Sequence, residues 1–407
     1  KAKKTIYYDK AILKIYDIPL FYFPKFFHPD PTVKRQSGFL IPFLTDKSSI
    51  GAGIATPYFW AINNDKDLTF TPKIYTGHKS LFLTEYRQAF ENSFLHLDAS
   101  YTQGYEDTSD TKTPGSRNHI FGKFDMNLSR DPSYESNFSL NIQRVSKDTY
   151  LRIHDIDTGL VNSEKTDLKN EIKYKFKKDD KYFDISGSVY EDLNVTSNKK
   201  YEYMLPNINF GKSLFASPVL GTLDFKSLVY RNNYAVNKSS QYFINNFIWN
   251  SKKFFTKKGL VNSLEAHVKN TNYESENDSK LKSSGSINEI AGVFAFKSKL
   301  PLKKESLNYT NTLSPNFMLR VAPGHMRDLH DDSLTLSYSN LFSTIKTNKS
   351  DVIESGTSAI LGFDLTFDKK KGDTLEEKFN LSLGQAFSLQ NNRDLPSQTS
   401  LDQKMSD

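Results

Sequence analysis

The sequence predicts an all-β protein whose main part is a large antiparallel transmembrane β-barrel. Alternation of apolar and polar residues at period two recurs along the chain. The connections between these segments are alternately long and short. No stretch approaches the ~18 consecutive apolar residues of a membrane helix, and we expect no helix of any length. The mean hydropathy of −0.57 still fits a barrel, because lumen-facing polar residues alternate with lipid-facing apolar ones.

The N-terminal segment differs in composition from the rest of the chain. Residues 11–27, AILKIYDIPLFYFPKFF, are dense in apolar and aromatic residues and are interrupted by Pro19 and Pro24. We therefore expect residues 1–35 to form the last strands of a separate β-domain and residues 36–407 to form the barrel. Because the chain begins without a methionine or an apolar signal segment and stops without a terminal strand, we expect a fragment of a longer, processed protein.

The first two expected barrel strands, within residues 34–60, each carry a proline. Pro42 and Pro57 cannot donate to a ladder, so two prolines in neighbouring strands predict a sheet that is weak at a chosen place. Each removes one potential bond worth about 0.5–1.5 kcal/mol, so the pair would ease opening by about 1–3 kcal/mol. The sequence does not say which neighbouring strand loses the bond, and the alternative that both prolines occupy bulges or strand ends for shape alone stays open.

Regular alternation identifies the later strands. The first clear example places five residues on one face: Ile120, Gly122, Phe124, Met126 and Leu128. The pattern returns at residues 134–143, 168–177 and 379–387. Together with the expected connections it gives about 18 strands of the usual ~10 residues. One expected strand ends at Phe342; beyond it the alternation is lost, and residues 343–356, where the scheme requires a short turn, are too long for one.

Connection lengths orient the expected barrel. Long connections are predicted at residues 104–118, 146–166, 231–239, 271–286 and 320–332, with tight turns near 131, 179, 251–256 and 301–305. Short periplasmic turns and longer external loops are typical of outer-membrane barrels. If the link from the fifth to the sixth strand is external, the first strand runs outward and everything before it lies in the periplasm.

Composition and motifs argue against several kinds of chemistry. The lysines behind the net charge of +7 are spread along the chain, which favours a solvated surface over a nucleic-acid partner, and without cysteine there is no disulfide or thiolate metal site. Gly51-Ala52-Gly53 precedes no helix, so it is not a phosphate loop. No nucleophile motif stands between a strand and a helix, and we expect neither an enzyme nor a cofactor.

The densest ligand-like cluster lies in one polar loop. Its members are His325, Asp328, His330, Asp331 and Asp332. Spacing within a flexible loop fixes no coordination geometry, so we interpret the cluster as an exposed polar loop and expect no metal site.

Several blocks of the sequence carry a family resemblance. The longest are IPLFYFPKFFHPDPTVKRQSGFLIPF at residues 18–43 and GAGIATPYFWAINNDKDLTFTPKIY at 51–75, followed by Glu85-Tyr86-Arg87; a later block is DDSLTLSYSNLF at 331–342 with Asp351, Glu354 and Gly356. Their order resembles the LptD family, the lipopolysaccharide-assembly proteins of the Gram-negative outer membrane. The later block departs from the family at Val352, where an arginine would be usual.

The resemblance implies a fold and a role. The fold is a periplasmic β-jellyroll followed by a barrel of about twenty-six strands, so this chain would hold the C-terminal end of the jellyroll (residues 1–35) and an incomplete barrel (36–407). The protein would sit in the outer membrane with its N-terminal part in the periplasm. It would receive lipopolysaccharide from the bridge protein LptA, carry the plug lipoprotein LptE in its lumen, and release its substrate through a lateral gate at Pro42 and Pro57 into outer-membrane lipid.

The resemblance also suggests a lipid path. The residues that would line it are Ile12, Ile15, Leu20, Phe21, Tyr22, Phe23, Phe26 and Phe27. The alternative is that these side chains form the core of the jellyroll.

Two other functions remain open at this stage. A passive porin or outer-membrane receptor needs only the barrel and would leave the proline-bearing strands and the upstream aromatic segment unexplained. A soluble β-sandwich or adhesin module is less compatible with so many amphipathic strands in succession. Solubility only in detergent separates barrel from sandwich, and copurified lipopolysaccharide separates transporter from porin.

Overall fold

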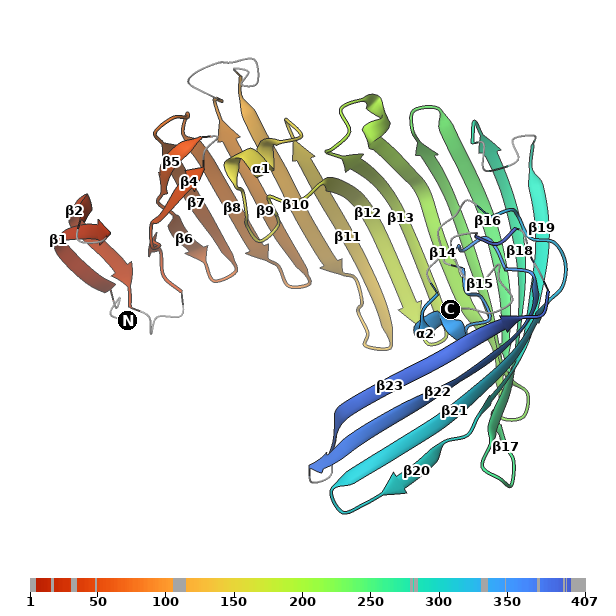
Figure 1. Cartoon of the computed structure of the whole chain (residues 1–407). Helices are drawn as coiled ribbons and strands as arrows, with labels where there is room; N and C mark the ends of the chain where they lie inside the picture. Colours follow the sequence, from red (N-terminus) through yellow and green to blue (C-terminus); the bar gives the residue numbers. More distant parts are fainter. Residues whose placement is uncertain are drawn as a thin grey trace. The chain divides into compact units, whose positions relative to one another are not determined.

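The computed structural model confirms the predicted all-β class with a large antiparallel sheet, because 66% of the chain is strand and 3% is helix. It describes residues 5–15, 18–30, 35–47, 50–104, 115–278, 281, 285–330, 336–347, 349–371, 374–390, 392 and 394–396. The large sheet contains 21 strands that follow one another in chain order, and a two-stranded sheet precedes it (Figure 1). In the described residues, no helix is long and apolar enough to cross a membrane.

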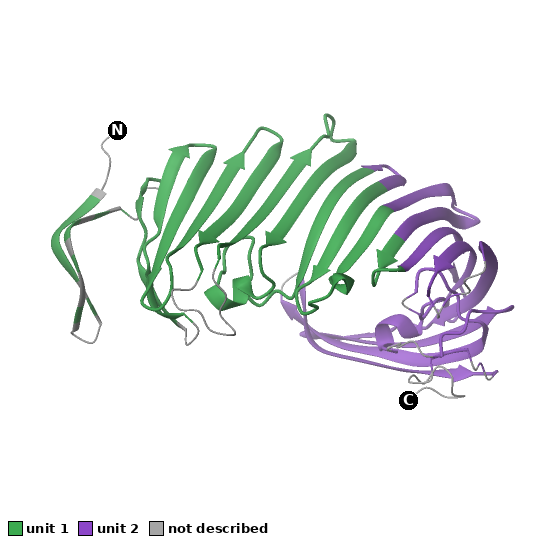
Figure 2. Ribbon diagram, turned by 90° about the horizontal axis from the view of Figure 1, so that it is seen from above, with its two compact units in different colours: residues 1–176, 184–206, 232–237 green, residues 177–183, 207–231, 238–407 purple. Residues whose placement is uncertain are grey.

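The chain divides into two compact units, coloured in Figure 2. The first comprises residues 1–176, 184–206 and 232–237, and the second comprises residues 177–183, 207–231 and 238–407. Four strands contribute residues to both units: β12 (Asp167–Lys178), β13 (Lys181–Asp192), β14 (Tyr201–Ser217) and β15 (Gly221–Tyr234).

The N-terminal sheet of the first unit is a hairpin of β1 (Thr5–Ile15) and β2 (Ile18–Pro29). Its strands pair from Thr5 opposite Pro29 to Ile15 opposite Ile18, with one irregularity after Leu13.

The remaining strands of the first unit form a meander. They are β3 (Gly38–Phe39), β4 (Phe43–Lys47), β5 (Gly51–Ala55), β6 (Tyr58–Asn63), β7 (Lys66–Tyr75), β8 (Leu81–Ala89), β9 (Ser93–Thr102), β10 (Arg117–Asn127) and β11 (Tyr134–Val145). In β10 the predicted alternation is present, since Ile120 is 54% exposed while its neighbours His119 and Phe121 are buried.

The long connection at residues 146–166 covers one face of this meander. It contains α1 (Tyr150–His154), which ends at Asp155 in the left-handed conformation. Tyr150, Leu151 and Ile156 are fully buried and pack in one cluster with sheet residues such as Leu81 and Phe121. We call this side of the sheet the loop-covered face; the core of the first unit lies there.

The second unit continues the same pattern with longer strands. They are β16 (Lys238–Asn250), β17 (Phe254–Phe255), β18 (Val261–Glu276), β19 (Ile287–Lys299), β20 (Leu302–Glu305), β21 (Tyr309–Ala322), β22 (Gly356–Lys371) and β23 (Thr374–Ser388). Between β21 and β22 the chain forms α2 (Tyr338–Leu341), which packs its Leu341 against Met318 and Ile360 of the sheet.

The structure corrects three expectations. The strand expected to end at Phe342 is wrong, because residues 338–341 form α2, begun by a capping box at Ser337. The expectation of no helix is also wrong: α1, α2 and the 3₁₀ turn η1 (Asn198–Lys200) occur in the described part of the chain, each within a long connection whose polar residues gave no helical period. The sheet has more than the expected 18 strands because prolines split the first two passes and β17 and β20 are short strands beside turns.

Candidate functional site

Pro42 and Pro57 lie where the first two crossings of the sheet by the chain are interrupted. We call these crossings passes: β3 and β4 make the first, β5 and β6 the second, and β7 the third. Pro42 falls between β3 and β4, and Pro57 falls between β5 and β6. Phe39 stands opposite Tyr58 and Phe43 stands opposite Ala55, so one pass has an extra residue between these pairs. Pro42 therefore occupies a bulge, one of the few positions in a sheet that tolerate proline.

Pro57 weakens the ladder between the first and second passes. The amide N–H of Leu40 donates to the carbonyl of Pro57 at 2.9 Å. In an antiparallel pair of this kind the two residues exchange both bonds, but Pro57 has no N–H to return. The rung between the two passes is therefore held by one hydrogen bond in place of two.

A third proline does the same between the second and third passes. Thr56 donates its N–H to the carbonyl of Pro72 in β7 at 3.1 Å, and Pro72 cannot donate back. On its other side Pro72 stands opposite Phe82 in an uninterrupted ladder with β8. Sequence reasoning missed Pro72, although the equal spacing of fifteen residues between Pro42, Pro57 and Pro72 was a signal for a row across three strands.

We call the interrupted region the seam: residues 38–63 with Pro72. Glycine contributes to it, since a Cβ on Gly53 would stand 2.5 Å from the ring of Tyr75 and 3.0 Å from Thr45. Gly53 lets the Tyr75 ring lie flat across β5. The Gly51-Ala52-Gly53 run lies inside strand β5 and has a structural role there, in agreement with the interpretation that it is not a phosphate loop.

An ion-pair cluster fastens the chain just before the seam. Arg35 donates to Asp67 Oδ2 at 2.6 Å, and Arg87 Nε donates to Asp67 Oδ1 at 2.9 Å. Arg35 belongs to the connection between β2 and β3, whereas Asp67 and Arg87 face each other on β7 and β8. The cluster therefore anchors the connection from the N-terminal hairpin to strands on the far side of the interrupted passes.

A buried polar network fastens the connection 146–166 to the loop-covered face. His119 contacts Asp98 Oδ1 through Nε2 at 2.7 Å and Ser100 Oγ through Nδ1 at 2.5 Å, and Ser100 Oγ lies 2.7 Å from Tyr150 OH. Serine, histidine and aspartate also make up hydrolytic triads, but here Tyr150 covers the hydroxyl and all four residues are buried. Their arrangement supports attachment of the loop.

His154 of α1 lies beside this network without polar contacts of its own. It is 1% exposed, and neither ring nitrogen has a hydrogen-bond partner. Burial, followed by the neighbouring His78, Arg117 and Lys73, lowers the pKa of His154 to about 3. The imidazole is therefore neutral at physiological pH.

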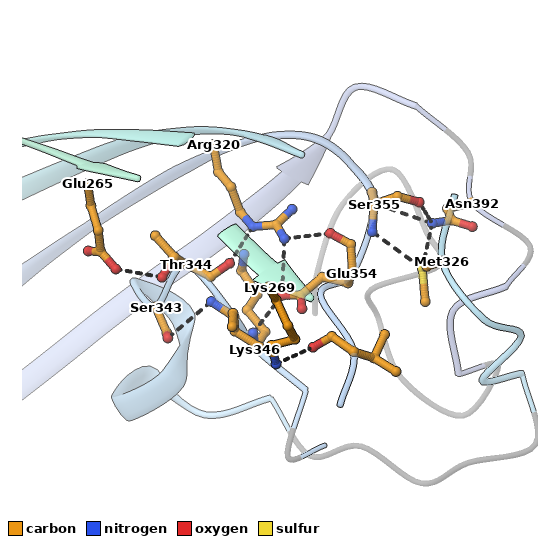
Figure 3. A network of polar contacts seen from close by, with 12 residues as sticks. Glu265, Lys269, Arg320, Met326, Ser343, Thr344, Lys346, Glu354, Ser355 and Asn392 are labelled. Carbon is orange, nitrogen blue, oxygen red and sulfur yellow. Dashed lines mark hydrogen bonds and ion pairs between the residues drawn. The ribbon is translucent and has the colours of Figure 1, made fainter. Parts of the chain in front are cut away.

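In the second unit, charged residues hold the long connection 323–355 (Figure 3). Arg320 of β21 is 2% exposed and donates from Nε to the carbonyl of Thr344 at 2.7 Å and from Nη2 to that of Glu354 at 2.5 Å. Lys269 of β18 donates to the carbonyls of Ser350 and Val352 at 2.6 and 3.2 Å. Two buried cations thus bind the backbone of the connection, which nothing in the sequence pattern indicated.

Lys346 lies within this connection and is also buried. Burial, followed by the nearby Arg320, lowers the pKa of Lys346 to about 8. Glu354 accepts the backbone N–H of Lys346 and lies 3.6 Å from Arg320. Arg327 pairs with Asp351 and lies over the ring of Tyr273. Val352, the position that departs from the resembling block, is buried and accepts from Lys269 through its backbone.

Comparison with known proteins decides the family. A family model described as "LPS transport system D" matches residues 115–407, and one described as "LptD protein" matches residues 6–217. The chain belongs to the LptD family. This confirms the resemblance carried by the blocks at residues 18–43 and 51–75. The LptD family is one of transport and assembly proteins rather than an enzyme family.

Individual relatives agree. An LPS-assembly protein LptD from Shewanella oneidensis is 27% identical over 402 residues, covering 94% of this chain and 50% of the relative. Those from Shewanella denitrificans and Legionella pneumophila (strain Lens) are 29% and 26% identical over 210 and 193 residues, covering 49% and 45% of this chain and 25% and 22% of the relatives. The chain spans about half the length of the curated relatives it matches over most of its residues.

A solved structure, a bacterial polysaccharide outer membrane secretin, matches with a TM-score of 0.26 and 8% identity. It covers 67% of this chain and 86% of that one. A TM-score this low does not establish a common fold.

Three of the residues expected along an LptD lipid path are exposed on the N-terminal hairpin. Ile12 is 52% exposed, Tyr22 stands opposite it at 54%, and Phe27 is 37% exposed. The side chains of the other five lie outside the described residues: Ile15, Leu20, Phe21, Phe23 and Phe26. Ile12 and Tyr22 lie on one face of the two-stranded sheet, whereas Phe27, five residues further along β2, lies on the other.

The polar loop with the densest ligand-like residues is only partly described. Asp331 and Asp332 lie outside the described residues, and Asp328 accepts the backbone N–H of His330 at 2.9 Å. Over the described ranges, no group of three or more histidine, cysteine, aspartate or glutamate residues is placed to hold a metal ion.

Proposed function

We propose that this chain is part of an outer-membrane translocon that receives lipopolysaccharide from the periplasm and inserts it into the outer leaflet. The lateral exit would lie at the seam, with Pro42 and Pro57 as gate residues. The observation that carries the proposal is the pair of half-bonded rungs at Leu40–Pro57 and Thr56–Pro72, in a chain of the LptD family. A passive porin needs no weakened strands.

The physical argument rests on what a lipopolysaccharide requires. Its acyl chains must avoid water and its sugars must avoid hydrocarbon, so delivery needs a lateral opening through the wall of the sheet. Backbone groups exposed to hydrocarbon are expensive, which normally keeps membrane strands paired. At the seam, the carbonyls of Leu40 and Thr56 lack the N–H that Pro57 and Pro72 cannot supply. Fewer hydrogen bonds therefore have to break when the strands separate.

The proposal extends to organisation and partners. Residues 1–35 would be the C-terminal end of a periplasmic jellyroll, and residues 36–407 would belong to the membrane barrel. The exposed pair of Ile12 and Tyr22 on one face of the hairpin supports an apolar path on the periplasmic side. The bridge protein LptA would deliver the substrate and the lipoprotein LptE would occupy the lumen, as the family resemblance implies.

Replacing both gate prolines tests the proposal. In the full-length protein, Pro42→Ala with Pro57→Ala restores the N–H opposite Leu40, so opening should be disfavoured by about 0.5–1.5 kcal/mol for that bond, or about 2- to 12-fold. We expect slower appearance of newly made lipopolysaccharide at the cell surface, with unchanged barrel assembly.

Pro315 provides the matched control. It lies within β21, accepts from Leu300 at 3.0 Å, and leaves the ladder with β22 intact. Pro315→Ala should leave surface delivery unchanged. Normal delivery in the Pro42/Pro57 variant, or an equal defect in the Pro315 variant, would contradict the gate.

Photo-crosslinking tests the lipid path separately. Crosslinkers at Ile12, Tyr22 and Phe27 should form adducts with lipopolysaccharide, while one at the exposed Tyr182 of β13 serves as the control. Adducts at none of the three hairpin positions would favour their burial in a jellyroll core.

A further inference from the structure

The turn between β16 and β18 carries an unusual combination of side chains. Residues 252–258 read KKFFTKK, and all seven are exposed; we call this segment the lysine–phenylalanine hairpin. Its position at the end of the long strands β16 and β18 is visible in Figure 1, where β17 marks the two phenylalanines. Thr256 accepts the N–H of Gly259 and donates its own to Leu260, both at 3.0 Å, so the turn is folded.

The two phenylalanines are exposed on opposite faces of the hairpin. Phe254 is 46% exposed and Phe255 is 71% exposed, and they pair by backbone with Asn262 and Val261. Because successive residues of a strand point to opposite faces, no single protein surface within the described residues covers both rings. Apolar area of this size is costly in water.

The four lysines of the hairpin have no carboxylate partner in the described part of the chain. Lys252, Lys253, Lys257 and Lys258 form no ion pair there, whereas Lys303 and Lys370 share Glu305 on a neighbouring turn and strand. The positive charge of the hairpin is therefore not neutralised by the protein around it.

The two neighbouring turns, 217–221 and 300–308, also expose apolar side chains, and the second also carries lysines. Trp249 donates to the carbonyl of Leu220 at 2.9 Å, which joins the turn 217–221 to the end of β16. That turn exposes Val219 at 78%, and the turn 300–308 exposes Leu307 at 93%. Together the turns 217–221, 251–260 and 300–308 contain six lysines and one glutamate.

This excess of lysine is not shared by short turns in general. In the first unit the turns 63–66, 90–93 and 128–133 contain two basic and three acidic residues. These first-unit turns also expose apolar side chains, Phe90 at 46% and Leu128 at 37%, so what distinguishes the three turns of the second unit is their excess of lysine.

We propose that the lysine–phenylalanine hairpin binds anionic phospholipid head groups at the membrane surface. Aromatic side chains favour the interface, and lysines near a charged leaflet attract it by about 1 kcal/mol each, or about fivefold in affinity. A fluid leaflet can surround both faces of a narrow hairpin, whereas an acidic protein surface would cover one ring and leave the other in water. The proposed function enters only in assigning the short turns to the periplasmic leaflet.

Lipid binding to the full-length, detergent-solubilised protein tests this. Phosphatidylglycerol, phosphatidylcholine, lipopolysaccharide and an acidic protein are titrated separately, and the bound ligand is counted by native mass spectrometry. We expect Lys257→Gln with Lys258→Gln to weaken phosphatidylglycerol binding about 30-fold without affecting phosphatidylcholine. Phe255→Ser should weaken binding of both lipids, because it removes apolar contact rather than charge.

Lys147→Gln with Lys199→Gln is the matched control. Both lysines are exposed and unpaired among the described residues, and they lie on long connections at the opposite ends of their strands. This variant should bind phosphatidylglycerol like the parent. Unchanged binding in the Lys257/Lys258 variant, an equal loss in the control, or a loss seen only with lipopolysaccharide or an acidic protein would overturn the proposal.

Surface delivery of lipopolysaccharide separates this inference from the gate. The Pro42/Pro57 variant should bind phosphatidylglycerol normally while delivering slowly. Normal delivery in that variant would refute the gate and leave the lipid measurement unaffected, whereas failed lipid binding would refute only the hairpin.

Discussion

The seam and the ladders of β21–β23 differ in the continuity of their strand pairing, although both consist of antiparallel strands. Between β3 and β6 only two residue pairs form, Gly38–Phe59 and Phe39–Tyr58, before the bulge at Pro42. From Tyr309–Lys369 to Ala322–Gly356, β21 and β22 pair without a shift. The seam therefore has fewer backbone bonds to break over the same length of chain.

A proline alone does not make a sheet weak at its position. Pro315 sits in β21 as Pro57 sits in the second pass, yet β21 is continuous. Pro315 withholds one bond from Leu300 in a ladder that continues from β19 into β20, and its other ladder, with β22, is unbroken. Pro57 and Pro72, by contrast, withhold theirs in two adjacent ladders. Alignment of lost bonds across adjacent strands is what concentrates the weakness.

The two long connections differ as well. Residues 146–166 are held on the first unit by the apolar packing of α1, which buries the neutral His154, and by the Tyr150 hydroxyl, with Lys200 pairing to Asp148 near one end. Residues 323–355 are held on the second unit by Arg320 and Lys269. The first attachment should therefore respond to pH and the second to loss of charge.

The largest effect is expected from Arg320→Ala. Removing one partner from a buried ionic network costs about 3–5 kcal/mol, so residues 336–355 should exchange their amide hydrogens much faster. Lys299→Gln, which breaks an exposed pair with Asp364, should change exchange little. If amide hydrogens of the seam also exchanged faster in Arg320→Ala, the seam and residues 336–355 would not be independent of each other.

A moderate effect is expected from acidification. His154 has a pKa of about 3 when the loop is packed and about 6.5 when it is released, so packing is strongest above pH 6.5 and weakens as pH falls towards 3. At pH 5 the loss is about 2 kcal/mol. Limited proteolysis within residues 146–166 should be faster at pH 5 than at pH 7.

The His154→Phe variant is the control for that experiment, because it keeps an aromatic ring without a titrating group. Its proteolysis should lose most of the pH dependence. An unchanged pH dependence in the variant would contradict the role given to His154.

The smallest effect is expected from Pro72→Ala, which tests a single bond of the seam. The alanine N–H can return the bond to Thr56, worth about 0.5–1.5 kcal/mol, or about 2- to 12-fold in protection of the seam amides from hydrogen exchange. Pro315→Ala should leave seam protection unchanged. Equal protection in parent and Pro72 variant would mean that the rung at Thr56 opens independently of this bond.

Much of the fold was predictable because strand alternation is local. Ile120, His119 and Phe121 take their faces from a period of two, and the turn at Asp131 follows from its own sequence. The end of β21 and the start of β22 were harder, because residues 323–355 fold by contacts with Arg320 and Lys269 that lie far away in the chain. Local patterns carry no information about such partners.

Amino-acid order was enough to establish an all-β chain of the LptD family with prolines in its first strands, because periodicity, motif order and the missing proline N–H are properties of residues read one after another. The partners of those prolines are set by the fold: Pro57 withholds its bond from Leu40, Pro72 withholds one from Thr56, and Pro42 fills a bulge. The direction in which a strand residue points its carbonyl depends on register, and register is fixed by pairing between strands rather than by either strand alone.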